Sequence, residues 1–248
     1  MVRKITLAFP VIFSLLFSVS PGYAEEPIQM AAGFSLSNKY SLFEISGFEL
    51  DPDYTTANID LIWFYGEMYL RLNYDRSIKD DTQNLGGGTH AVFSRQDAGA
   101  TFGYNLSNRV SVFGGILAGN TEFPIFTSAG TDNFTHELSY VGPFAGTSYS
   151  YPLRKGSLSL SIAYTKMNGA FSIYDPANND QATSHGTTDG LSYGIVWSRR
   201  VNEAMNFQMG YKVNRFEFND DEVAVDGNDN STKDNMNIFS IGFIVFFE

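Results

Sequence analysis

Hydrophobic and polar residues alternate along most of this chain with a period of two. In the clearest run, Met205 to Val213, every second residue is apolar, and the residues between them are small or polar. The same alternation recurs at 67–75, 157–165 and 191–198. This period predicts β-strands with one apolar face and one small or polar face. A sandwich of two sheets would show the same period with its apolar face inward, so the period alone does not separate a sandwich from a barrel.

The lengths of the expected strands and of their connections favour a barrel. Ten strands are expected, near 34–50, 55–64, 67–77, 91–105, 109–122, 134–150, 157–173, 188–200, 205–219 and 235–247. Short turns between them alternate with long polar loops, which are expected at 77–90, 123–133, 174–188 and 219–234. Short turns at one rim and long loops at the other are typical of outer-membrane barrels, in which an even strand number brings both chain ends to the periplasmic side.

The predicted fold class is therefore an all-β, antiparallel, up-and-down transmembrane β-barrel of about ten strands. The first strand pair carries the weakest pattern, because its connection near Asp51-Pro52-Asp53 is short. An eight-stranded barrel with an N-terminal extension is the alternative.

The first residues have the features of an export signal. Arg3 and Lys4 precede an apolar stretch from Ile5 to Val19, and Gly22 and Ala24 are the small residues expected just before a cleavage site. The stretch is short for a helix that spans a bilayer. We therefore expect a signal peptide over residues 1–24 and a barrel domain over residues 25–248. The chain has no cysteine, which excludes lipoprotein acylation and a disulfide framework.

Beyond this segment, the longest uncharged apolar stretch runs from Ile238 to Phe247. It is too short for a transmembrane helix but long enough for a tilted transmembrane strand. Aromatic side chains also gather near the expected strand ends, where rings settle at the level of the lipid headgroups. The expected periplasmic girdle comprises Trp63, Phe64, Tyr65, Tyr104, Tyr149, Tyr151, Trp197 and Phe247. The expected outer girdle comprises Phe134, Tyr174, Phe216 and Phe218, for which packing in a core is the alternative.

The last strand carries a short motif. Ser240, Gly242, Val245 and Phe247 occupy the polar, glycine, hydrophobic and hydrophobic positions of a pattern that resembles the C-terminal assembly signal of bacterial outer-membrane barrels. The resemblance implies recognition by the barrel-assembly machinery through strand pairing at an open edge. That family usually ends on the aromatic residue, whereas here Glu248 follows it. The resemblance identifies no subfamily, and small barrels of this superfamily include structural proteins, adhesins, narrow pores and lipid-modifying enzymes.

Charged residues occur on the face that is expected to line the lumen. They are Asp60, Glu67, Arg71, Asp75, Arg95, Asp97, Arg200 and Lys212. Because side chains fill barrels of about eight strands and water-filled channels appear at about sixteen, ion pairs that fill a narrow lumen are favoured over a polar pathway or gate. The formal net charge of −11 argues against nucleic-acid binding, which requires a basic surface.

The sequence assigns no catalytic residue. His90, His136 and His185 fall in or beside the expected outer loops, and lipid hydrolases of the outer membrane resemble such an arrangement of histidine and serine at the rim. His136 and Ser139, however, are an odd number of residues apart on one strand, and Ser184 is adjacent to His185, so each pair diverges. We therefore expect the protein not to be an enzyme.

The acidic loops assign no metal site or cofactor. The pairs Asp80-Asp81 and Asp220-Asp221 are also what solvated loops contain. The segment from Asp226 to Ser231 alternates oxygen ligands like a calcium loop, but Ser231 replaces the glycine and Asn237 the bidentate glutamate of that template. The run Gly86-Gly87-Gly88 lacks the following Lys-Ser/Thr of a phosphate loop and indicates a mobile loop.

These patterns predict an integral protein of the bacterial outer membrane, with outer-membrane lipid, lipopolysaccharide and the barrel-assembly machinery as its partners. A structural or surface-interaction role is favoured, because a charged lumen and long loops need nothing more. A narrow porin-like channel for small solutes or ions is the first alternative, and a lipid or peptide hydrolase at the outer rim is the second.

Overall fold

The computed structural model describes residues 28–45, 48–127, 132–220 and 231–247. The predicted signal peptide and calcium-like loop lie outside these residues, apart from Ser231. The strands are β1 (Gln29–Ile45), β2 (Phe48–Leu50), β3 (Asp53–Tyr65), β4 (Met68–Lys79), β5 (Asp81–Gly86), β6 (Thr89–Asn105), β7 (Val110–Phe126), β8 (Asp132–Leu153), β9 (Gly156–Asp175), β10 (Asp180–Asn202), β11 (Met205–Asp220) and β12 (Ser231–Phe247). The described part of the chain contains no helix that is long and apolar enough to cross a bilayer.

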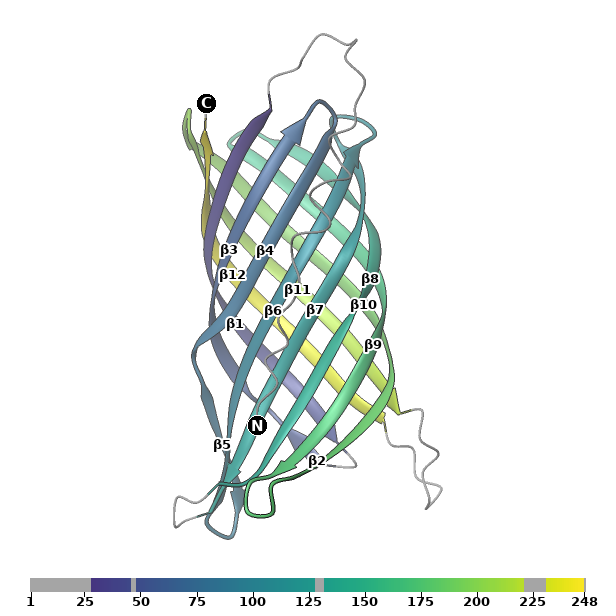
Figure 1. The fold of residues 1–248 in the computed structure, drawn as a ribbon. Helices are drawn as coiled ribbons and strands as arrows, with labels where there is room; N and C mark the ends of the chain where they lie inside the picture. The colour runs from purple at the N-terminus through teal and green to yellow at the C-terminus, as the bar shows by residue number, and fades with distance from the viewer. Residues whose placement is uncertain (1–27, 46–47, 128–131, 221–230, 248) are drawn as a thin grey trace.

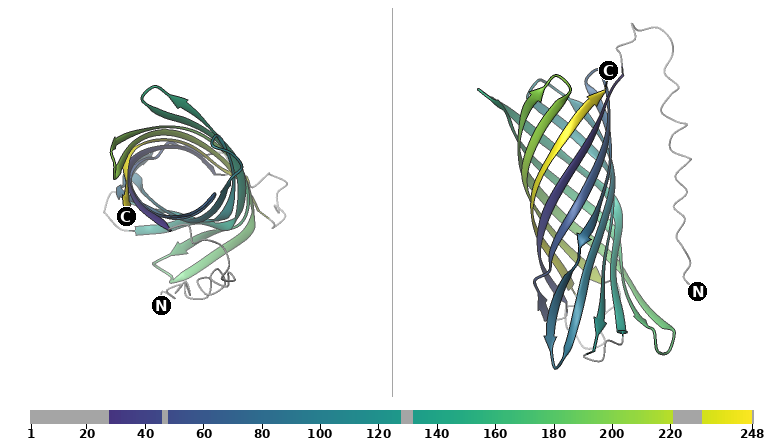
Figure 2. Two further views of the ribbon diagram at one scale, coloured as in Figure 1. Left: turned by 90° about the horizontal axis from the view of Figure 1, so that it is seen from above. Right: turned by 90° about the vertical axis from the view of Figure 1, so that its left-hand side faces the viewer.

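Ten of these strands close into one antiparallel barrel (Figures 1 and 2). They follow one another around the wall in the order β1, β3, β4, β6, β7, β8, β9, β10, β11 and β12, and β12 pairs with β1 to close the ring. The short strands β2 and β5 pair with β1 and β6. The prediction of an all-β barrel with ten strands is confirmed, and the eight-stranded alternative is wrong, because β1 and β3 are full members of the wall.

The pairing register fixes the tilt of the strands. A row of paired residues followed from Phe43 around the whole barrel returns to β1 at Ala31, an offset of twelve residues. With a rise of about 3.3 Å per residue and about 4.8 Å between strands, this offset tilts the strands by about 40° from the barrel axis. The wall then has a radius of about 10 Å, which side chains from opposite strands can fill.

The two rims differ as expected, but the outer loops are shorter than predicted. Tight connections join β3 to β4, β6 to β7, β8 to β9 and β10 to β11 at the periplasmic rim. In the connection from β8 to β9, Gly156 has φ 115°, which side-chain-bearing residues rarely adopt. The predicted outer loops at 77–90, 123–133 and 174–188 were wrong over most of their length, because the strands from β4 to β10 continue into them. These strand ends lie above the membrane and carry polar residues on their outward face, so their sequence looks like loop.

The outward face of the wall forms an apolar band with a sharp upper limit. On β9, Leu160, Ile162 and Tyr164 are exposed on the outside, and the next outward residue is Lys166. Most of the other strands show a comparable change, and we call the level at which it occurs the outer boundary. On β12 the apolar side runs from Phe239 to Phe247, which corresponds to about 20 Å along the axis and is close to the apolar height of outer-membrane barrels.

The motif of the last strand lies at the seam of the barrel. Val245 and Phe247 face outward, whereas Ser240 and Gly242 face the lumen opposite Ser37 and Ser35 of β1. A Cβ atom on Gly242 would lie 2.5 Å from the Ser35 Cβ, so glycine permits the close approach of β1 and β12.

Candidate functional site

A network of polar side chains crosses the lumen near the level of the outer boundary. Its members come from seven neighbouring strands, are mostly buried, and are joined by ion pairs and hydrogen bonds. We call it the lumen network: Lys39, Ser41, Thr56, Asp75, Arg95, Asp97, Thr121, Tyr140 and Asp234.

Arg95 is the centre of this network. Its guanidinium lies 3.0 Å from Asp97 Oδ2 and 2.5 Å from Asp234 Oδ2, and the side chain is 2% exposed. It also donates to Thr121 Oγ1 and to the hydroxyl of Tyr140, which in turn donates to Asp97 Oδ1 at 2.9 Å. Because Arg95 is on β6 and Asp234 is on β12, this ion pair spans the lumen.

Lys39 of β1 connects Asp75 of β4 to the same network. Its ammonium lies 2.6 Å from Asp75 Oδ1 and 2.9 Å from Asp97 Oδ2. Thr56 donates a further hydrogen bond to Asp75 Oδ2 at 3.1 Å, and Ser41 donates to Asp234. Each buried carboxylate therefore faces a cation, which is the arrangement that offsets the cost of burying charge.

An apolar layer lies directly above the lumen network, on the side of the outer rim. It consists of side chains that are at most 4% exposed: Phe43, Tyr54, Ala91, Phe93, Phe123, Leu138 and Phe218. The Phe93 and Phe123 rings are stacked with their centroids 5.0 Å apart, and Phe43 packs edge-on against Phe123.

Glycines on the lumen face make room for these large groups. A Cβ atom on Gly119 would lie 2.3 Å from the Tyr140 ring, and one on Gly169 would lie 2.6 Å from the Phe218 ring. Glycines and bulky side chains therefore alternate on the lumen face of the wall, as is needed to fill a narrow barrel.

Water reaches the lumen below the network. Arg71 forms a bidentate ion pair with Asp60, with Nε 2.9 Å from Oδ1 and Nη2 3.0 Å from Oδ2. The Arg71 side chain is 47% exposed. Lys212 is also exposed on the lumen face of β11, where several of the nearest strands carry glycine or serine. Arg71 and Lys212 are thus exposed cations on the periplasmic side of the lumen network.

Five of the eight predicted lumen charges lie in the lumen network or in the ion pair below it. Asp75, Arg95 and Asp97 are in the network, and Asp60 and Arg71 pair below it. Lys212 faces the lumen between these two groups without joining either.

Two of the predicted lumen charges are misplaced. Glu67 lies in the turn between β3 and β4, because β4 begins one residue later, at Met68. The inward and outward alternation of β4 therefore does not include Glu67. Arg200 lies at the periplasmic end of β10 and donates to the carbonyl oxygens of Asn202 and Glu203. Both residues therefore lie at the rim, away from the network.

Sequence reasoning missed two charged residues of the network, Lys39 and Asp234, as well as its hydroxyl-bearing members. Lys39 continues the alternation that places Ser35 and Ser37 of β1 on the inward face, and this alternation is the signal that could have identified it. Asp234 was assigned to a loop, although it is the fourth residue of β12. The expected outer girdle also needs correction: Phe216 and Phe218 are buried inside the barrel, at 4% and 3% exposure, because they occupy inward positions of β11. Phe64 of the expected periplasmic girdle stacks on Phe246 of the inward face.

The histidines do not meet a catalytic partner in the described residues. His136 stacks against Phe123 and lies tilted against Phe171, and its Nδ1 atom has no hydrogen-bond partner among the described residues. Ser139 lies on the opposite face of β8 and donates to the carbonyl oxygen of Ala170 on β9, and His90 stacks on Phe126. Within the described residues, no three His, Asp or Glu side chains lie close enough together to hold a metal ion.

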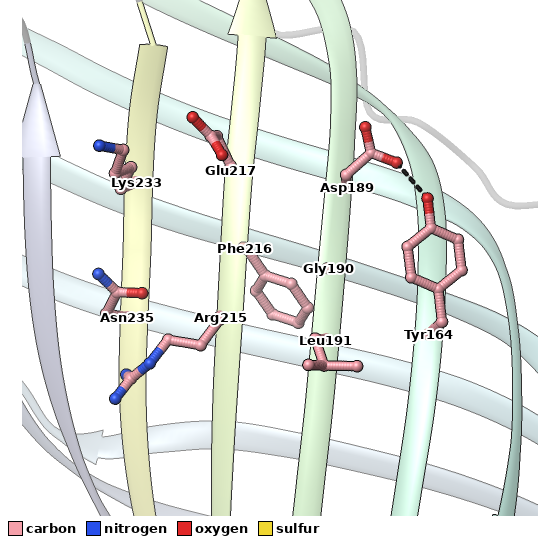
Figure 3. A pocket seen from close by; sticks show the side chains of 9 residues that line it. All are labelled: Tyr164, Asp189, Gly190, Leu191, Arg215, Phe216, Glu217, Lys233 and Asn235. Carbon is pink, nitrogen blue, oxygen red and sulfur yellow. Dashed lines mark hydrogen bonds between the residues drawn. The ribbon is translucent and has the colours of Figure 1, made fainter.

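A cavity of about 260 Å³ lies on the outside of the wall, across β9 to β12 (Figure 3). It sits on the outer boundary, with apolar residues on its membrane side and charged residues on its outer side. We call it the boundary pocket, and it is lined by Tyr164, Asp189, Gly190, Leu191, Arg215, Phe216, Glu217, Lys233 and Asn235.

The fold has known counterparts among solved structures. The outer-membrane protease OmpT of Escherichia coli superposes with a TM-score of 0.60 at 10% identity, over 92% of this chain and 99% of that one. The translocator domain of the autotransporter NalP of Neisseria meningitidis gives a TM-score of 0.48 at 13% identity, over 89% of each chain. Ail of Yersinia pestis gives 0.42 at 10% identity, over 88% and 99%.

No protein-family model matches the sequence, and no curated protein matches it either. The fold is that of the bacterial outer-membrane β-barrels, and the apolar band around the wall places the protein in the outer membrane. At such low identity the likeness to OmpT concerns the fold alone.

Proposed function

We propose that this protein is a closed barrel with a structural or surface-interaction role, exerted through the part of the wall that rises above the membrane. The observation that carries the proposal is the apolar layer across the lumen. An ion that crosses it would lose its hydration shell without gaining polar partners, which costs many kcal/mol.

The dimensions of the barrel support a closed lumen. At a wall radius of about 10 Å, rings from opposite strands are long enough to meet. Phe43, Phe93 and Phe123 come from β1, β6 and β7, and each is at most 2% exposed. The lumen network beneath them adds a second obstruction, in which Arg95 and Lys39 each form ion pairs with two carboxylates.

A narrow channel is the second candidate, and one observation favours it. Arg71 and Lys212 are exposed to water in the periplasmic half of the lumen. A polar path therefore extends from below as far as the network, and conduction would need only the network and the apolar layer to rearrange.

Conductance in planar bilayers tests the two candidates. Refolding is first verified by the difference in gel mobility between unheated and boiled samples. We expect the native barrel to be silent and a Phe93→Ala/Phe123→Ala variant to conduct in discrete steps. Ile162→Ala, which removes an outward-facing side chain, is the matched control and should stay silent.

The opposite result identifies a channel. Reproducible steps in the native protein that shrink in Arg71→Gln or Lys212→Gln would overturn the closed-barrel proposal. A hydrolase would instead show turnover of a lipid or peptide substrate that His136→Ala abolishes; the packing of His136 among phenylalanine rings does not favour this reading.

A further inference from the structure

The boundary pocket lies where the headgroups of the outer leaflet meet the wall. Its membrane side is formed by Leu191 and the Tyr164 ring, which are 41% and 54% exposed. Its outer side carries the outward-facing charged residues Asp189, Glu217 and Lys233. A ligand in this pocket would therefore contact both the polar and the apolar parts of a lipid.

The acidic residues of the pocket already face partners of their own. Asp189 accepts a hydrogen bond from the Tyr164 hydroxyl at 2.5 Å and is paired in the strand register with Lys166 (Figure 3). Glu217 is paired in register with Lys233, whose ammonium lies 3.7 Å from Glu44 Oε2 of β1. Asp189 and Glu217 are also register partners of each other, so this row of the outer face places two acids between Lys166 and Lys233.

Arg215 differs from these residues. Its register partners on both flanking strands are neutral, Leu191 on β10 and Asn235 on β12. Among the described residues it has no ion-pair partner, although it is exposed at headgroup level. In Figure 3 its side chain leaves β11 toward β12 and ends below Asn235, while Lys233 lies above Asn235. Arg215 of β11 and Lys233 of β12 therefore lie on either side of the Asn235 amide.

We propose that the boundary pocket binds the phosphate of an outer-leaflet lipid. Arg215 donates paired N–H groups to the phosphate oxygens, Asn235 donates through its side-chain amide, and Lys233 supplies the second positive charge. Leu191, together with Tyr211 and Phe239 further down the wall, offers exposed apolar surface to the acyl chains. The charge pattern and the depth in the membrane thus point to the same ligand.

The test measures the affinity of the refolded barrel, in detergent micelles, for a bisphosphorylated acylated glucosamine disaccharide. The same lipid without its phosphates and inorganic phosphate alone are the comparison ligands. The variant is Arg215→Gln/Lys233→Gln. The matched control is Arg76→Gln/Lys79→Gln, which removes two exposed cations of β4 outside the boundary pocket.

We expect the pocket variant to bind the phosphorylated lipid at least about tenfold more weakly, because charge-assisted hydrogen bonds are lost. Its affinity for the lipid without phosphates should not change, and the control should bind like the native protein. Equal weakening in the control would overturn the proposal in favour of unspecific surface attraction. Equally tight binding of inorganic phosphate would overturn the assignment to a lipid. The proposal does not depend on the state of the lumen, so its failure would leave the closed-barrel proposal standing.

Discussion

Removal of the Arg95 charge is the most direct test of the lumen network. Arg95 and Asp234 are 2.5 Å apart, and their side chains are 2% and 3% exposed. Arg95→Met keeps an apolar stem of similar length, but among the described residues it leaves the Asp234 carboxylate with only the hydroxyl of Ser41 as a partner. Breaking a buried ion pair in this way costs about 3–5 kcal/mol of unfolding free energy.

A double-mutant cycle separates this pairing from general damage to the packing. Asp234→Asn keeps an acceptor for the guanidinium, so it should cost about 1–3 kcal/mol. The loss of unfolding free energy in the double variant should be about 1–3 kcal/mol smaller than the sum of the two single losses. The reason is that the double variant leaves neither the guanidinium nor the Asp234 carboxylate without its partner.

The free energies would come from urea titrations of the barrel refolded in lipid vesicles. The chain has two tryptophans, Trp63 and Trp197, both on the outward face, so their fluorescence reports loss of the membrane environment. Arg76→Met, an exposed change outside the network, should cost less than about 0.5 kcal/mol. Additive effects of the two network variants would refute the reasoning, since they would mean that Arg95 and Asp234 do not depend on each other.

Three further changes probe the wall. Ile162→Arg places a charge in the apolar band and should destabilise the barrel in vesicles by about 2–4 kcal/mol, whereas Asn168→Arg, above the outer boundary, should be nearly neutral. Gly119→Ala should push the Tyr140 ring out of the network and lower stability by about 1–3 kcal/mol in the same titration, because the added Cβ lies 2.3 Å from that ring. Phe247→Ala should reduce the amount of barrel in isolated outer membranes while leaving spontaneous refolding into vesicles unchanged, if the C-terminal motif is read by the assembly machinery.

Much of the wall could be predicted from the sequence. The period of two assigns each residue of a strand to one of two faces, and in Leu158 to Tyr164 or Met205 to Tyr211 the large apolar residues fall on the outward side. Strand number and orientation followed from the alternation of turns and loops, because a membrane strand must be about ten residues long. The membrane thus imposes a pattern that a single sequence displays.

The interior depended on the tertiary structure. Lys39 and Asp234 are 195 positions apart in the sequence, yet both join Arg95 and Asp97 in one network, because β12 closes against β1 and the register offset sets which residues share a level. Phe216 and Phe218 looked like girdle residues, and only the closed barrel showed that they point inward. Local pattern determined the face of each residue, whereas ring closure and shear decided which inward residues meet, since those contacts join strands that are distant in the sequence.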